Sequence, residues 1–219
     1  AAEFFMANSE GICVDDKIVL LGTNKLGVFD PAAKKLTPQE LGNTTSMELS
    51  TVNKARTEFS FVDVGSRQLV RVGKDAAQKK AVTFANNILL SAESNGTKLY
   101  VFNDSHVVLA QSDSKQEGSH KLVTLKVQDG TVVKSTALSK VPSDGIEYDT
   151  ERFVLQYDDG ETKLVNAATH EGGTISKSGS VVADDSFPII KDSNSEFIVS
   201  DGYVWFTAQH WGVIGYKVP

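Results

Sequence analysis

The chain has 219 residues, a net charge of -6 and a pI near 5.2. Surfaces that bind phosphates need clustered Lys and Arg, so this charge argues against a nucleic-acid partner. No run of 18 apolar residues occurs, and the sequence predicts no membrane-spanning helix. All-β chains of this length commonly form one domain, and we expect a single domain over 1–219, with a cloning remnant within residues 1–4.

The sequence shows no motif for redox, metal or nucleophilic chemistry. Cys13 is the only cysteine, which excludes an intramolecular disulfide and favours a reducing, intracellular compartment. Because Cys13 lies in an apolar strand, it is expected to be a buried, inert thiol. The four histidines lack metal-ligand spacing, and neither a phosphate-binding Gly-rich loop nor a nucleophile elbow is present. We therefore expect no catalytic residue, metal or cofactor.

Taken in chain order, the predicted strands form five repeats. In each repeat an apolar half-strand leads through an Asp at a tight turn into a hydrophobic strand. Four copies span 13–21, 100–109, 146–155 and 197–206, and a degenerate copy over 49–62 has Asn53 in place of the Asp. Turn positions 16, 53, 104, 149 and 201 are about 46 residues apart, which is typical of four-stranded propeller blades.

A second hairpin follows in four of the repeats and completes four strands. The predicted strand pairs are 25–30 with 35–37, 68–72 with 81–84, 121–127 with 131–135, and 162–165 with 174–176. The turn in the third pair is Asp129-Gly130, which predicts a type I′ turn with positive φ at both residues. In the fourth pair the turn is expected at Gly172-Gly173. The pattern thus predicts an all-β chain of antiparallel hairpins.

The last repeat supplies only a third strand, over 212–218, while an unassigned strand precedes the first repeat. We expect the strand around Phe4–Ala7 to pair with the strand around Val213–Tyr216, because ring closure removes exposed sheet edges. The central strands should be buried between blades. The residues predicted to be mostly buried are Val19, Leu21, Phe61, Val108, Val154 and Trp205.

The stretch from Lys17 to Leu36 resembles a blade of the WD40, quinoprotein and YVTN-type propellers. A strand ending in Gly-Thr is followed by a turn and by Phe29-Asp30, where those families carry an aromatic-Asp pair. The resemblance implies a propeller of five four-stranded blades, and the strand-like run 88–92 keeps a ring of six open. The Gly-His element of WD40 repeats and the Trp-Gly motifs of quinoproteins are absent, so no quinone cofactor is implied.

The repeated turn acids allow two interpretations. Five-bladed glycosidases place carboxylates at the ring axis, one as general acid and one as nucleophile or base. An Asp also stabilises its own turn by accepting backbone N–H bonds two residues on, and this structural interpretation is favoured. The acids concerned are Asp15, Asp16, Asp104, Asp149 and Asp201.

The sequence favours a non-catalytic protein-interaction module that binds another protein or a peptide as a monomer. Its predicted binding face consists of the connections after each second strand, at 22–24, 65–67, 113–118, 158–161 and 209–212. The candidate binding residues are Asn24, Arg67, Asp159, His210 and Trp211, with Arg and Trp as anchors because these types dominate binding hot spots. The alternative is a carbohydrate-active or glycan-binding propeller, although Trp occurs only twice.

Overall fold

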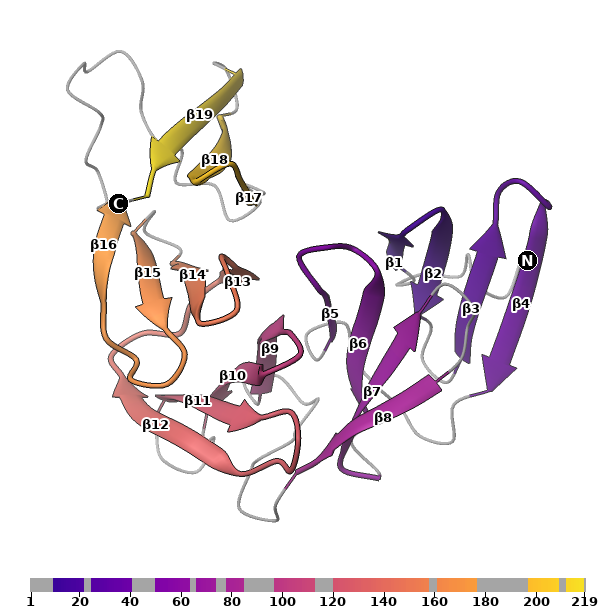
Figure 1. Cartoon of the computed structure of the whole chain (residues 1–219), viewed down its shortest axis with the longest axis horizontal. Coiled ribbons are helices and arrows are strands. Elements are labelled where there is room, and N and C mark those ends of the chain that lie inside the picture. The colour runs from indigo at the N-terminus through magenta and orange to yellow at the C-terminus, as the bar shows by residue number, and fades with distance from the viewer. Residues whose placement is uncertain are drawn as a thin grey trace.

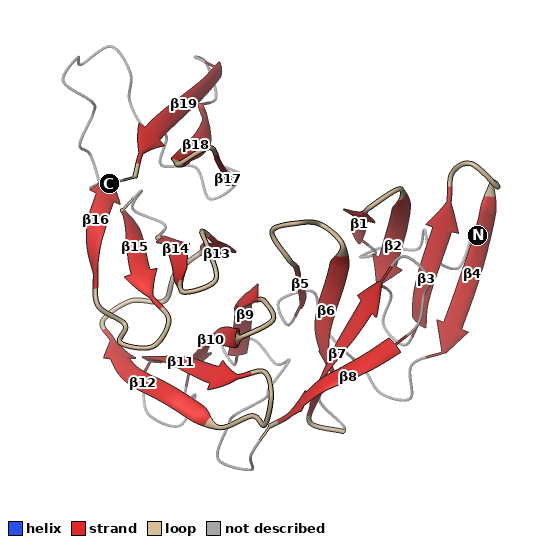
Figure 2. Ribbon diagram, in the orientation of Figure 1, coloured by secondary structure: helices blue, strands red, loops and turns tan. Residues whose placement is uncertain are grey.

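The computed structural model describes residues 10–21, 25–40, 50–63, 66–73, 78–84, 97–112, 120–157, 161–176, 197–208 and 212–218. These residues form strands and turns (Figure 2). Within these ranges no helix is long and apolar enough to cross a membrane. The described part of the chain is therefore all-β, as the sequence predicts.

The strands form five antiparallel sheets that follow one another along the chain (Figure 1). The first sheet comprises β1 (Glu10–Val14), β2 (Lys17–Leu21), β3 (Lys25–Asp30) and β4 (Lys35–Glu40). The second comprises β5 (Ser50–Val52), β6 (Glu58–Asp63), β7 (Gln68–Gly73) and β8 (Gln78–Thr83). The third comprises β9 (Thr97–Phe102), β10 (His106–Ser112), β11 (His120–Lys126) and β12 (Val132–Leu138). The fourth comprises β13 (Asp144–Glu147), β14 (Arg152–Gln156), β15 (Thr162–Asn166) and β16 (Gly172–Ser176), and the fifth β17 (Phe197–Ser200), β18 (Tyr203–Ala208) and β19 (Gly212–Lys217).

Each sheet is a meander in which strands adjacent in sequence are adjacent in space. The predicted turn hairpin of every repeat forms its first two strands, and the predicted second hairpin forms the third and fourth. Among the described residues the fifth sheet has three strands, the deficit that the sequence indicates. The period of about 46 residues thus corresponds to one sheet.

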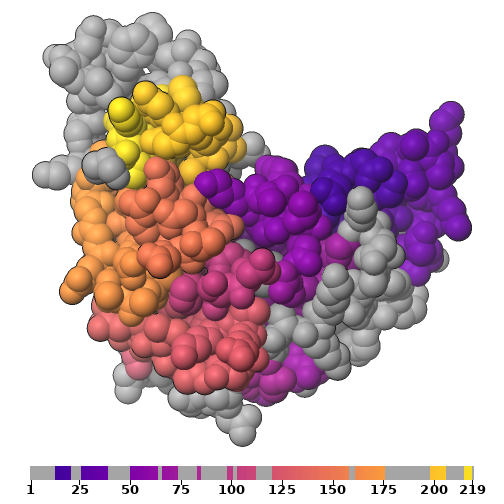
Figure 3. All heavy atoms as spheres, viewed as in Figure 1, coloured from indigo at the N-terminus to yellow at the C-terminus, as the bar shows by residue number. Residues whose placement is uncertain are grey.

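The five sheets are arranged in an arc, with their first strands on its inner side (Figure 1). Along this side β5 contacts β9, β9 contacts β13 and β13 contacts β17. No strand of the first sheet pairs with one of the fifth in the described ranges, and a notch separates these sheets in the space-filling view (Figure 3). Residues 4–7 and 88–92 lie outside the described residues, so the predicted ring closure is not confirmed.

Apolar clusters fill the spaces between consecutive sheets. The first and second sheets enclose Val14, Val19, Leu26, Val28, Phe59, Phe61, Val70 and Val72. The second and third enclose Val62, Leu69, Phe84, Leu99, Val107, Leu109, Val123, Leu125 and Val127. The third and fourth enclose Tyr100, Val108, Phe153 and Leu155 among others, and the fourth and fifth enclose Val154, Val204 and Val218. Burying each large side chain contributes about 1.5 to 3 kcal/mol.

Four of the residues predicted to be buried are buried, namely Val19, Phe61, Val108 and Val154. The side chain of Leu21 lies outside the described residues. Trp205 is partly buried, which agrees with a mostly buried side chain, and its neighbour Val204 is fully buried. Successive side chains of a strand point to opposite faces, so burying Val204 turns Trp205 outward.

The first and fifth sheets each have an apolar row on the face turned away from the neighbouring sheet. In the first sheet, cross-strand pairing aligns Cys13, Ile18, Phe29 and Leu36. In the fifth, Trp205 lies opposite Ile198, which is 53% exposed. Cys13 is exposed, so the prediction of a buried thiol is wrong. Cys13 lies on this outer row because its neighbour Val14 faces the second sheet.

In the fifth sheet Trp205 also lies opposite Gly215, and the indole lies directly over that glycine. A Cβ atom at Gly215 would be 2.5 Å from the indole ring, so only glycine permits this approach. The indole nitrogen donates a 3.3 Å hydrogen bond to the Ser200 carbonyl. The ring of Tyr203 is 5.2 Å from that of Trp205, centroid to centroid.

The Asp-Gly dipeptides at 129–130 and 201–202 behave differently. Asp201 and Gly202 connect β17 to β18 with φ of 53° and 78°, the two positive values of a type I′ turn. At Asp129-Gly130 only Gly130 has positive φ, so the predicted type I′ turn is wrong there. The connection between β11 and β12 is longer than a two-residue turn, since β11 ends at Lys126 and β12 begins at Val132. Within it the Gly130 N–H donates a hydrogen bond to the Lys126 carbonyl. The other predicted glycine turn is also wrong, because Gly172 and Gly173 lie in β16.

Candidate functional site

The first turn of the second, third and fourth sheets is capped by an Asx side chain. Oδ1 of Asn53 accepts hydrogen bonds from the main-chain N–H groups of Thr57 and Glu58. Oδ1 of Asn103 accepts from Ser105 and His106. The equivalent oxygen of Asp149 accepts from residues 151 and 152 at 3.0 and 2.7 Å. The structural interpretation of these turn residues is thus supported, with Asn103 rather than Asp104 as the repeated position.

The carboxylate of Asp149 is also stabilised in this turn by an ion pair with Arg152. Burial alone would raise the pKa of its carboxyl group. Hydrogen bonds from Arg152 and from the main-chain N–H groups of Glu151 and Arg152 outweigh this effect and hold the pKa below its usual value. The Arg152 guanidinium lies 2.7 Å from Oδ2 of Asp149. A carboxyl group held in its ionised form is a poor general acid at neutral pH.

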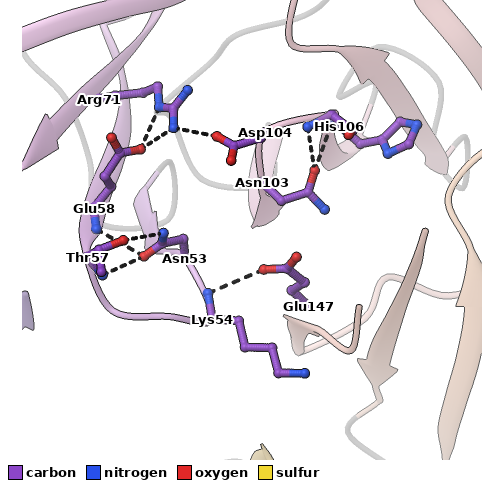
Figure 4. Close-up of polar contacts among 10 residues, drawn as sticks. Asn53, Lys54, Thr57, Glu58, Arg71, Asn103, Asp104, His106 and Glu147 are labelled. Carbon is purple, nitrogen blue, oxygen red and sulfur yellow. Dashed lines mark hydrogen bonds and ion pairs between the residues drawn. The ribbon is translucent and has the colours of Figure 1, made fainter. Parts of the chain in front are cut away.

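Asp104 has a different role, because it connects two sheets. The guanidinium of Arg71, on β7, pairs with Glu58 on β6 and reaches across to Oδ1 of Asp104 at 2.8 Å (Figure 4). Asp16 pairs with Lys17 at 3.0 Å. Asp16, Asp104 and Asp149 therefore each have a cationic partner.

A pocket of about 180 Å³ opens on the inner side of the arc, where three sheets meet. Its walls come from β5 and the following turn, from β9 and from β13. Its lining residues are Thr51, Val52, Asn53, Lys54, Arg56, Tyr100, Asp144, Gly145, Ile146 and Glu147. The pocket therefore carries two acids, from β13, and two basic residues, from the β5–β6 turn.

The pocket wall is built by close approach of β9 to β13. Tyr100 is buried, and its phenol donates a 2.7 Å hydrogen bond to the Pro142 carbonyl. The Thr51 hydroxyl donates to the Tyr100 carbonyl at 3.3 Å, which connects β5 to the same strand. Gly145 lies against the Tyr100 ring, since a Cβ atom at Gly145 would be 2.6 Å from Cβ of Tyr100.

Glu147 is the half-buried acid of this pocket. Its Oε2 accepts a hydrogen bond of 3.4 Å from the main-chain N–H of Lys54 (Figure 4). Burial raises the pKa of its carboxyl group, and the charge of Asp104 adds to this effect. Hydrogen bonds from the Lys54 N–H and the Asn103 side chain, together with the charge of Lys54, only partly oppose the increase. The hydrogen bonds and nearby charge thus replace only part of the hydration that the Glu147 carboxylate loses on burial.

The Lys54 amine does not form an ion pair with Glu147, because it contacts Tyr148 instead. It donates to the Tyr148 carbonyl and lies 5.5 Å from the centroid of the Tyr148 ring. Figure 4 shows the Lys54 side chain extending away from the Glu147 carboxylate. Arg56 is exposed and has positive φ, in the turn between β5 and β6.

Of the predicted binding residues, only Arg67 lies within the described ranges. It is half-buried in the turn between β6 and β7, has a φ of 54°, and its carbonyl accepts a 2.8 Å hydrogen bond from the Phe84 N–H. The other four candidates, Asn24, Asp159, His210 and Trp211, lie outside the described residues. In the described part of the chain no three potential metal ligands gather.

Sequence reasoning missed the pocket residues Lys54, Tyr100, Gly145 and Glu147. The available signal was their position relative to the repeat, since Lys54 follows the turn residue Asn53 and Glu147 precedes the turn residue Asp149 by two positions. First strands of neighbouring blades lie side by side on the inner side, which brings such positions together.

No family model matches the chain, and neither does any curated protein. The chain is similar to a chain of the nidogen/laminin complex, with a TM-score of 0.54 and 9% identity over 94% of this chain and 73% of that one. It is similar to the computationally designed Ika8 protein, with a TM-score of 0.53 and 10% identity over 95% and 70%. A streptogramin B lyase gives a TM-score of 0.50 and 10% identity over 96% and 68%. At these identities the likeness concerns the fold alone, which is all-β and propeller-like.

Proposed function

We propose that this chain is a non-catalytic protein-interaction module that binds another protein or a peptide as a monomeric domain. The observation that carries the proposal is the position of five corresponding connections, which join the second strand of each sheet to the third. Because every sheet is an antiparallel meander, these connections leave the sheets at equivalent ends. Variable connections on a rigid frame are a common way to build a binding surface.

The anchors of this surface are Arg67 and Trp211, with Asn24, Asp159 and His210 as further contact residues. Each belongs to one of these connections. The position of Arg67 supports its assignment to this surface, because Arg67 lies in the turn between β6 and β7, which is one of the five connections. Trp and Arg are the residue types whose truncation most often costs 2 kcal/mol or more at an interface.

The frame of the proposed module is a closed ring of five sheets. Residues 4–7 add to β19 as the fourth strand of the fifth sheet, and the outer rows of the first and fifth sheets pack together. Two observations support closure. Among the described residues the fifth sheet has three strands where the other sheets have four. The first and fifth sheets also each have an apolar outer row, which contains Phe29 in the first sheet and Trp205 in the fifth. A closed ring leaves neither row exposed to solvent.

A carbohydrate-active propeller is the second candidate, and Glu147 is the observation that favours it. A carboxyl group with a raised pKa is a typical general acid. Two observations favour binding instead. The pocket, at about 180 Å³, is below the range of roughly 300 to 1,000 Å³ that is usual for small-molecule sites. The turn acids Asp149 and Asp104 are engaged with Arg152 and Arg71.

The proposal is tested by capturing partners from native extract with the wild-type chain and with the combined Arg67→Ala and Trp211→Ala variant. We expect the variant to bind the captured partner at least about 30-fold more weakly, since the loss of a single hot-spot anchor already costs about 2 kcal/mol. Lys35→Ala, an exposed residue at the start of β4, is the control and should bind like the wild type.

Two results would contradict the proposal. Unchanged affinity of the folded double variant would show that the chosen face is wrong. Turnover of a glycoside substrate that is abolished by Asp16→Asn, Asp149→Asn or Glu147→Gln would show that the chain is an enzyme rather than a binding module.

A further inference from the structure

We propose that the pocket between β5, β9 and β13 receives a basic side chain of the partner, Lys or Arg, with the Glu147 carboxylate as its acceptor. This inference rests on the proposed function and assigns to it a second contact point, away from the connections that carry Arg67. It also specifies the chemistry of the partner segment.

The size of the pocket fits one side chain. Its volume of about 180 Å³ corresponds to roughly six water molecules at their share of liquid volume. The aliphatic walls from Val52 and Ile146 suit the methylene groups of Lys or Arg, which pack against apolar surface while the charged end reaches a polar partner.

The pocket presents two carboxylates that can accept a cation, Glu147 and Asp144, beside two basic residues of the β5–β6 turn, Lys54 and Arg56. At Glu147 burial raises the pKa of the carboxyl group and the charges of Lys54 and Asp104 oppose each other, so a bound cation would restore part of the lost stabilisation of the carboxylate. The Lys54 amine, a candidate for an internal counter-ion, is held by the Tyr148 carbonyl and ring. Glu147 is therefore hydrogen-bonded to the Lys54 main-chain N–H and to the Asn103 side chain, with no ion pair to the Lys54 amine.

The walls are held in place before any ligand binds. Tyr100 is fixed by its hydrogen bond to Pro142, and β5 is connected to β9 through Thr51. Glu147 itself is held by a neighbouring sheet through Lys54. A preformed acceptor avoids the ordering cost that a mobile side chain incurs on binding, so the charge-assisted hydrogen bond contributes more fully to affinity.

The test uses three blocked pentapeptides in which glycines flank a central lysine, arginine or norleucine. Each is titrated into the 15N-labelled full chain, and the amide signals of Lys54, Gly145 and Glu147 are followed. We expect saturable shifts with the lysine and arginine peptides and none with norleucine, which has the same apolar stem without the charge. This comparison needs no variant, so it remains valid whether or not a substitution folds.

Two variants complete the test. Glu147→Gln should weaken binding of the lysine peptide about ten- to a hundredfold, the range of one charge-assisted hydrogen bond. Glu171→Gln, an exposed acid of the same sheet, should leave it unchanged. Equal binding of norleucine, absence of saturable shifts, or unchanged affinity in Glu147→Gln overturns the pocket proposal. A partner captured through Arg67 and Trp211 would in that case still support the proposed function.

Discussion

Nε2 of His170 lies 2.8 Å from the hydroxyl of Thr124, and this contact connects the fourth sheet to the third. The other ring nitrogen lies 2.9 Å from the Thr136 hydroxyl. Thr124 is fully buried, and His170 occupies the turn between β15 and β16 with a φ of 59°. Burial, together with the charge of Lys134, lowers the pKa of His170 from 6.5 to about 4.

His170 should make the stability of the chain depend on pH. In the unfolded chain its imidazole binds a proton near pH 6.5, whereas in the folded chain it does so only near pH 4. The unfolded state therefore binds more protons between these values, and stability falls as the pH decreases through this window. We expect a loss of about 2 kcal/mol, allowing for partial exposure.

Thermal unfolding from pH 7.5 to 4.5 measures this effect. His170→Asn should flatten the pH dependence, and Asn tolerates the positive φ. Thr174→Asn, an exposed and non-titrating position of β16, is the control and should retain the slope. A His170→Asn profile parallel to that of the wild type would show that His170 does not titrate as described.

Substitution of Asp149 should separate turn chemistry from catalysis. The chain itself uses Asn53 and Asn103 at equivalent positions, where the side-chain oxygen makes the same capping bonds. We therefore expect Asp149→Asn to cost less than about 1 kcal/mol, mainly through the Arg152 pair. Asp149→Ala should cost about 1 to 3 kcal/mol, because the turn N–H groups lose their acceptor. Urea unfolding compares the two variants, and equal losses would contradict the capping role.

Gly145 and Gly173 form a matched pair for testing the pocket wall. A Cβ atom at Gly145 would lie 2.6 Å from Tyr100, whereas at Gly173 it would meet nothing within 4 Å. We expect Gly145→Ala to lose about 1 to 3 kcal/mol by overpacking and Gly173→Ala to change stability by less than about 0.5 kcal/mol. Similar unfolding free energies for the two variants would mean that β13 and β9 are farther apart than described.

The repeat made the five sheets predictable, because alternating strands and turn residues are local signals. Ambiguity arose where two neighbouring residues satisfied the same local rule. Asn103 and Asp104 both suit the turn, and only the hydrogen bonds show that Asn103 caps it. Val204 and Trp205 both suit a strand core, and the packing of Val154 against Val204 makes Val204 the more deeply buried of the two.

The pocket could not be predicted, because it forms between three sheets that are separate in sequence. Lys54 and Glu147 are 93 residues apart and meet only when β5, β9 and β13 lie side by side. No local pattern distinguishes Glu147 from other acids of the chain. The exposure of Cys13 escaped prediction for a related reason, since it depends on what covers the first sheet.

Deletion of residues 1–8 should destabilise the chain if these residues supply the fourth strand of the fifth sheet. We expect the thermal midpoint to fall by about 5 °C or more, which corresponds to roughly 2 kcal/mol in a chain of this size. Differential scanning calorimetry at several protein concentrations measures this and detects any association. A truncated chain that melts like the full chain would contradict closure by this strand.

The most direct test of the closed ring is a distance between the outer rows of the first and fifth sheets. Cys13 is the only cysteine and is exposed on the first row, and Ile198→Cys places a second label site on the other. Both thiols are spin-labelled, and magnetically diluted protein is measured by dipolar broadening of continuous-wave spectra for short separations and by double electron–electron resonance for long ones. Packed sheets lie about 10 Å apart, so the closed ring predicts a label separation below about 20 Å. A single distribution centred beyond about 30 Å would show that the arc stays open and would contradict the account.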